Sequence, residues 1–165
     1  MTFNVAQIRF VPTSTGASTT VDDVEMRSEI EIDRPVEQVF AVVADMSRNP
    51  EWQTGMVSCT WTTEPPILVG STYDQVASFM GKEIRTSFAV TEYEAPSRIR
   101  IESTVSTFPL DITRIVEPHG DGSRVVAVIR GEPGGLMKLF APLMNIQARR
   151  SIRADYERLK ELLEG

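Results

Sequence analysis

Residues 30–45 read IEIDRPVEQVFAVVAD, and two periodicities meet within this one segment. Isoleucine and acidic residues alternate as far as Asp33, which is the pattern of a strand with one face in water. Pro35 ends the strand because its nitrogen has no proton to donate to a ladder hydrogen bond. From Val36 to Val43, valine and phenylalanine then recur at the spacing of an amphipathic helix that starts just after a proline. The segment predicts a strand that leads directly into a helix.

The sequence after this helix alternates between strand patterns and turn signals. A second, short helix is expected at residues 48–52, where Pro50 limits its length. Residues 56–131 predict six strands, and their short connections favour antiparallel pairing of neighbours. Residues 136–163 predict one helix, about 40 Å long, that is kinked or interrupted at Pro142.

One helix cannot cover a flat sheet of seven strands, and a flat sheet would therefore leave an apolar face in water. A sheet that curls around the helix removes this exposure. The predicted fold is an α+β domain in which a curved antiparallel sheet of seven strands wraps around the long C-terminal helix. Because a curled sheet and a kinked helix need not fill the space between them, an internal cavity is expected.

The chain has 165 residues, of which 41% are hydrophobic and 24% charged, as in a single globular domain. Residues 1–24 are rich in small polar residues, and we expect a flexible or loosely docked extension there, followed by one domain at residues 25–165. Cys59 is the single cysteine and can form no disulfide within the chain, and the first residues lack the pattern of a secretory signal. These features predict a cytoplasmic protein.

The net charge of −6 argues against nucleic acid as a partner, because such binders carry a basic face. It also disfavours attachment to an anionic membrane surface, and no stretch approaches the roughly 20 apolar residues that span a bilayer. Stable membrane insertion is therefore not expected. His119 is the only histidine, which excludes a metal site built on two imidazoles, and neither a metal nor a cofactor is predicted.

No catalytic constellation is visible in the sequence. The carboxylates of the predicted strands are interpreted as charges on the outer, solvated face: Asp74, Glu92, Glu102 and Asp111. A carboxylate that instead pointed inward would have a raised pKa and would be a catalytic candidate. Asp111 and Arg114 lie on opposite faces of a regular strand, so they could pair only with loose geometry.

The order of these elements resembles the helix-grip fold of the START-like (SRPBCC) superfamily. The resemblance covers residues 26–163 and rests on residues 30–45, on Pro50-Glu51-Trp52, on Val69-Gly70-Ser71 and on the final helix with Tyr156-Glu157-Arg158-Leu159-Lys160. The superfamily includes polyketide cyclase/dehydrase-like proteins, lipid transfer domains and plant hormone receptors. The resemblance implies the fold and a cavity, but it leaves the activity open because one fold hosts many functions.

The first half of the last helix is apolar on almost every side, and flexible methionines suit variable apolar ligands. The resemblance implies that this half faces the cavity and that Trp52 lies near its mouth. The candidate ligand-binding residues are Phe40, Trp52, Phe79, Phe88, Met137, Phe140 and Met144. Core packing is the alternative interpretation for each of them, and a contact between two copies in a homodimer is a further alternative for the helix.

Three functions are compatible with these patterns. The first is binding of a small hydrophobic molecule, such as a lipid, an isoprenoid or a polyketide-like compound, in the internal cavity. The second is a polyketide cyclase or dehydratase acting in the same cavity, which needs an inward polar group from Tyr73, Asp74 or Arg114. The third is a module that contacts another protein through the basic helix face at Arg149 and Arg153.

Overall fold

The computed structural model describes residues 24–79, 81–106, 109–131 and 137–165; for Val24, Phe79 and residues 137–145 it describes the backbone alone. These residues form seven strands, three α-helices and one 3-10 helix, η1. The elements are β1 (Val24–Ile32), α1 (Val36–Val43), η1 (Met46–Arg48), α2 (Asn49–Trp52), β2 (Met56–Trp61), β3 (Thr72–Phe79), β4 (Lys82–Glu94), β5 (Arg98–Val105), β6 (Leu110–His119), β7 (Gly122–Gly131) and α3 (Met137–Glu164). The predicted extension lies outside the described residues except for Val24, which opens β1.

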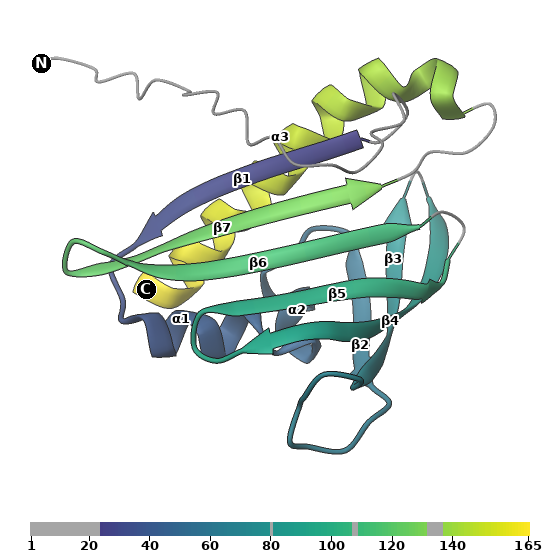
Figure 1. Cartoon of the computed structure of the whole chain (residues 1–165). Coiled ribbons are helices and arrows are strands. Elements are labelled where there is room, and N and C mark those ends of the chain that lie inside the picture. The colour runs from purple at the N-terminus through teal and green to yellow at the C-terminus, as the bar shows by residue number, and fades with distance from the viewer. Residues whose placement is uncertain (1–23, 80, 107–108, 132–136) are drawn as a thin grey trace, which may run out of the picture.

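The strands form one antiparallel sheet in the order β1-β7-β6-β5-β4-β3-β2. Neighbours in sequence are neighbours in the sheet, except that β1 pairs with β7 at one edge. The sheet curls, with α3 and the short helices behind its concave face in the view of Figure 1. The α+β fold predicted from the sequence, a curved sheet of seven strands around a C-terminal helix, is confirmed.

Helix α1 forms where the spacing of its apolar residues predicts it. Pro35 stands at its N-terminal cap, and Val39, Phe40, Val42 and Val43 are buried against the sheet. The helix ends at Ala44, after which the Asp45 carboxylate accepts a hydrogen bond from the Ser47 backbone N–H, at 3.1 Å, and starts η1. This capping turns the chain into η1 and α2 beside strand β2.

Helix α3 packs with Tyr156 and Leu159 in the core, as its apolar stripe predicts, and it runs as one helix through Pro142. Two of its basic side chains bind strand β1. Arg149 donates to the Glu25 carbonyl at 3.0 Å, and Lys160 donates to the Glu31 carbonyl at 2.8 Å. Both carbonyls belong to β1, so α3 shields an edge strand that could otherwise pair with another chain.

Among the described residues, no helix is both long and apolar enough to cross a membrane.

The turn between β6 and β7 illustrates how closely the elements approach. A Cβ atom added to Gly122 would clash with the Ile32 carbonyl oxygen, so only glycine fits where this hairpin crosses the end of β1.

Candidate ligand-binding site

The inner face of the sheet is sealed at one end and partly open at the other. At the sealed end, alternate strand residues are almost fully buried against α1 and α3, among them Ile32, Ile99, Val116 and Val125. At the other end the inward apolar residues are only half-buried: Met26, Ile84, Leu110, Ile112 and Ile129. This is the end at which β7 finishes and near which α3 begins (Figure 1). Among the described residues, half-buried apolar side chains therefore collect at one end of the concave face, which we call the open end.

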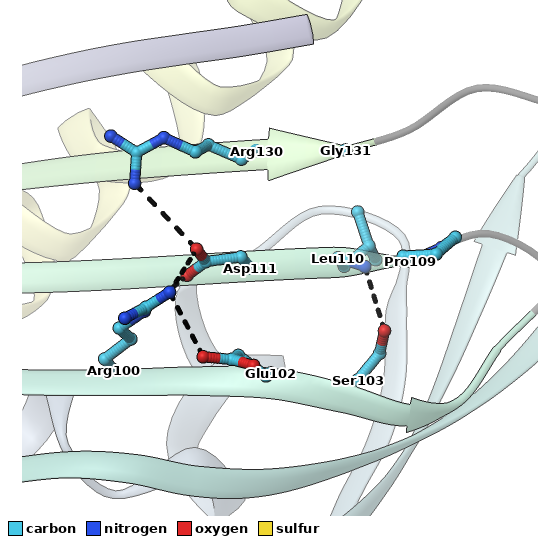
Figure 2. A pocket seen from close by; sticks show the side chains of 8 residues that line it. All are labelled: Arg100, Glu102, Ser103, Pro109, Leu110, Asp111, Arg130 and Gly131. Carbon is cyan, nitrogen blue, oxygen red and sulfur yellow. Dashed lines mark hydrogen bonds and ion pairs between the residues drawn. The ribbon is translucent and has the colours of Figure 1, made fainter. Parts of the chain in front are cut away.

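A surface depression of about 320 Å³ lies at the rim of the open end. There β5 and β6 separate, and the Leu110 N–H donates to the Ser103 hydroxyl at 2.8 Å instead of to a strand carbonyl. Figure 2 shows the outer side of this depression, where Arg100 binds Asp111 through two hydrogen bonds of 3.0 and 2.8 Å. Because Glu92, Glu102 and Arg130 also join this ion-pair network, its charges are already compensated.

The boundary between the open end and the sealed core is marked by a buried arginine. On β6, Arg114 is the next inward residue after Ile112, and it is 3% exposed. Its Nη1 atom donates to the Val43 carbonyl at 2.6 Å and to the Asn49 side-chain oxygen at 3.1 Å. Its guanidinium carbon lies 5.0 Å from the centre of the Trp52 ring, in cation–π contact. Within the described part of the chain, no carboxylate lies within ion-pair distance of Arg114.

Three polar atoms around this arginine are buried and have no hydrogen-bond partner among the described residues. They are Arg114 Nε, Trp52 Nε1 and the Tyr73 hydroxyl. All three residues come from different elements, β6, α2 and β3, and each is at most 3% exposed. A buried donor without an acceptor costs about 1–3 kcal/mol. Unlike the ion pairs of the outer face, these three buried donors therefore lack hydrogen-bond acceptors among the described residues.

Burial keeps the weakly acidic side chains near Arg114 protonated, namely those of Tyr73, Tyr156 and Cys59. Desolvation raises the pKa of Tyr73, while the charge of Arg114 opposes that rise. Desolvation also raises the pKa of Tyr156, and the charge of Arg114 again opposes the rise. The pKa of the Cys59 thiol rises to about 11 for the same reason, although a hydrogen bond to Asn49 opposes the rise. At neutral pH the positive charge of Arg114 is therefore surrounded by neutral hydroxyl and thiol groups.

The side chains of three predicted ligand contacts are described, and all three lie in the packed interior. Phe40 packs against Tyr93 at 5.8 Å between ring centres, and Phe88 stacks on Tyr73 at 5.1 Å. Trp52 is 1% exposed and packs against Tyr156, so it does not lie at an opening as the resemblance implied. The side chains of the other four lie outside the described part of the structure: Phe79, Met137, Phe140 and Met144.

The polar candidates divide between the two faces. Tyr73 and Arg114 point inward, whereas Asp74 is exposed on the outer face and accepts a hydrogen bond from Ser87 at 2.6 Å. Glu92, Glu102 and Asp111 are also outward, as predicted. Within the described strands the inward positions carry no carboxylate. The sequence does not single out Asn49 as a partner of Arg114, because nothing in a short Asn-Pro helix indicates which strand it faces.

Comparison with known proteins agrees with this architecture. Residues 23–164 match the family described as "Polyketide cyclase / dehydrase and lipid transport". The chain belongs to this family. The match spans nearly all of the described residues, and the START-like resemblance seen in the sequence is confirmed. No curated protein matches the chain.

Several solved structures share the fold. TTHA0849 from Thermus thermophilus is 22% identical, with a TM-score of 0.73 over 84% of this chain and 95% of that chain. A START superfamily protein from Mycobacterium smegmatis is 16% identical, with a TM-score of 0.69 over 85% of this chain and 97% of that one. The di-domain ARO/CYC BexL of the BE-7585A biosynthetic pathway is 13% identical, with a TM-score of 0.67 over 87% of this chain and 51% of that protein. Family membership and fold together point to hydrophobic ligand binding or a cyclase-type role.

Proposed function

We propose that the chain binds a small, largely apolar molecule (a lipid, an isoprenoid or a polyketide-like compound) between the inner face of the sheet and α3. The observation that carries the proposal is the change in burial along the inner face. Inward apolar residues are sealed beside α1 but only half-buried at the open end, where Leu110 and Ile112 lie. A ligand that buries ~300 Å² there gains roughly 7 kcal/mol before the costs of association, which is compatible with micromolar affinity.

The predicted contacts fit this proposal in different ways. Met137, Phe140 and Met144 belong to the first half of α3, which begins near the open end (Figure 1), and they remain the proposed helix side of the site. Phe79 ends β3 at the same end of the sheet. Phe40, Trp52 and Phe88 lie deeper, so a ligand would meet them only at the bottom of the site.

The test uses binding of the fluorescent dye N-phenyl-naphthylamine and native mass spectrometry of the purified chain. Ile112→Asp places a charge on the inner face at the open end, and we expect it to weaken dye binding at least about tenfold, because an unpaired buried charge is costly. Ile115→Asp is the matched control, since Ile115 is also half-buried on β6 but points outward. Equal dye binding by both folded variants, together with the absence of any co-purified apolar compound, would contradict the proposal.

A cyclase or dehydratase acting in the same site is a second candidate, favoured by the inward positions of Tyr73 and Arg114. Because its pKa is raised, Tyr73 stays protonated at neutral pH, so it could donate a hydrogen bond to a substrate oxygen but would be a poor proton donor and no base. The inward positions of the described strands lack a carboxylate to act as the base, which is why binding is our first choice. Loss of one water from the mass of a bound polyketide-like compound would favour the enzyme; an unchanged compound would favour the carrier.

We also propose that the protein works in the cytoplasm and does not bind nucleic acid. The free and buried Cys59 and the net charge of −6 are in keeping with both. A homodimer that covers the apolar half of α3 is a further proposal, and light scattering on the purified chain measures it directly.

A further inference from the structure

We infer that the ligand of this site is an amphipathic acid, whose anionic oxygen group is held by Arg114, Trp52 and Tyr73 while its apolar body lies toward the open end. The inference rests on the proposed function and specifies the chemical class of the ligand. Among the described residues, a buried positive charge has no opposite charge beside it and three buried donors have no acceptor. A purely apolar ligand would supply neither.

The first step is charge. Arginine stays protonated at all physiological pH values, and a buried cation is costly unless it is paired. The partners that the described residues give Arg114 are the Val43 carbonyl, the Asn49 amide, the Trp52 ring and the Met46 sulfur. All of these are neutral. An anionic oxygen group would supply the opposite charge that these partners do not.

The second step is hydrogen bonding. Arg114 Nε, Trp52 Nε1 and the Tyr73 hydroxyl can each donate one hydrogen bond, and none has an acceptor among the described residues. Strands β3 and β6 are separated by β4 and β5, but both residues are buried on the inner face of the curled sheet, and the charge of Arg114 opposes the rise in the pKa of Tyr73. A carboxylate has two oxygens with about four lone-pair sites. One carboxylate therefore has enough lone-pair sites for three such donors.

The third step is position. Along β6 the inward residues run from half-buried Leu110 and Ile112 to buried Arg114. Along β3 they run from half-buried Ala77 and Gln75 to buried Tyr73. Both polar residues are therefore the first fully buried ones met on the way in from the open end. A ligand with one acidic end and an apolar body matches this order, with the acidic end innermost.

The experiment compares two probes with the same apolar chain, dodecanoate and dodecyl alcohol, by displacement of N-phenyl-naphthylamine at pH 7.5. We expect dodecanoate to bind at least about tenfold more tightly, because its carboxylate can accept charge-assisted hydrogen bonds that the hydroxyl group of the alcohol cannot replace. Equal affinities, or tighter binding of the alcohol, would overturn the inference and leave the proposed function standing. If neither probe nor the dye binds, the proposed function fails with it.

The deciding variant is Tyr73→Phe, which removes one buried hydroxyl and leaves the stacked ring. We expect it to weaken dodecanoate binding about tenfold and to change dodecyl alcohol binding by less than about threefold. Tyr93→Phe removes a hydroxyl from a half-buried tyrosine near the sealed end and should change neither. Arg114→Met is less decisive, since it also deprives the Val43 carbonyl of its donor. If Tyr73→Phe raises the melting temperature but leaves the dodecanoate affinity unchanged, the hydroxyl contacts apolar side chains or a water molecule rather than the ligand. The inference is then wrong.

Discussion

At the scale of single residues, burial rather than charge determines the chemistry of the interior. Cys59 is 8% exposed, and its nearest polar neighbours are the side chains of Asn49 and Gln75, at 3.8 and 3.9 Å. The hydrogen bond from Asn49 favours the thiolate, yet loss of hydration outweighs it and the pKa rises to about 11. The thiolate is the reactive form, so Cys59 behaves as a small apolar residue, as free cysteines usually do.

This predicts the reactivity of the thiol. At pH 8 only about one thiol in a thousand is ionised when the pKa is near 11, against roughly a quarter for an ordinary cysteine with a pKa of about 8.5. We expect Cys59 to react with iodoacetamide at least about a hundredfold more slowly in the native chain than in urea. Mass spectrometry of the alkylated protein over time measures both rates, and similar rates would mean that the thiol is accessible and ionised.

At the scale of elements, Arg114 and Asn49 connect the short helices to the sheet. Arg114 on β6 reaches the Val43 carbonyl at the C-terminal end of α1, where a cation is favoured by the helix dipole. Asn49 in α2 accepts from Arg114 and donates to Met46 and Cys59, and it is 1% exposed. One buried amide thus links α2, η1, β2 and β6.

Replacing this amide should therefore destabilise the whole domain. We expect Asn49→Ala to lower the free energy of unfolding by roughly 2–3 kcal/mol, because it removes an acceptor from a buried cation and opens a small cavity. Gln53→Ala, at the end of the same short helix, is the control and should cost less than about 1 kcal/mol, since Gln53 is only half-buried. Urea unfolding followed by circular dichroism gives both values, and equal losses would show that the Arg114 contact contributes little.

At the scale of the whole molecule, the fold buries several weak acids around one cation. The pKa values of Cys59, Tyr73 and Tyr156 are all raised, in each case mainly by desolvation. Their values in the unfolded chain are about 8.5 for cysteine and about 10 for tyrosine. Below these values all three groups are neutral in both states, and the full stability is present. As the pH rises further, the unfolded chain loses protons first and the folded state loses stability.

We therefore expect the melting temperature to fall progressively from about pH 9 to pH 11, the range between the unfolded and folded pKa of Cys59. Differential scanning calorimetry at a series of pH values tests this. The double variant Cys59→Ala with Tyr73→Phe should lose less stability over the same range, because two of the three acids are gone. A double variant with an unchanged alkaline slope would place the cause in other groups.

Local spacing in the sequence is enough to place the elements and to orient many side chains within them. The change of periodicity at Pro35 specified β1 and α1, and the period of two placed Asp111 and Arg114 on opposite faces of β6. One helix cannot cover a flat sheet of seven strands, and this predicted that the sheet curls. Each of these depends only on local spacing or on how much apolar surface must be covered.

Which inward residues become neighbours depends instead on the packing of the whole domain. Tyr73 and Arg114 are 41 positions apart in the sequence and lie on strands separated by two others. Their relative placement on the inner face depends on the summed twist of the sheet and the irregular pairing of β4 with β5. The burial of Trp52 beneath Arg114 and the role of Asn49 depend in turn on where α2 settles on that curved face. Periodicity assigns a side chain to a face of its own element, whereas the partner it finds depends on how all the elements pack together.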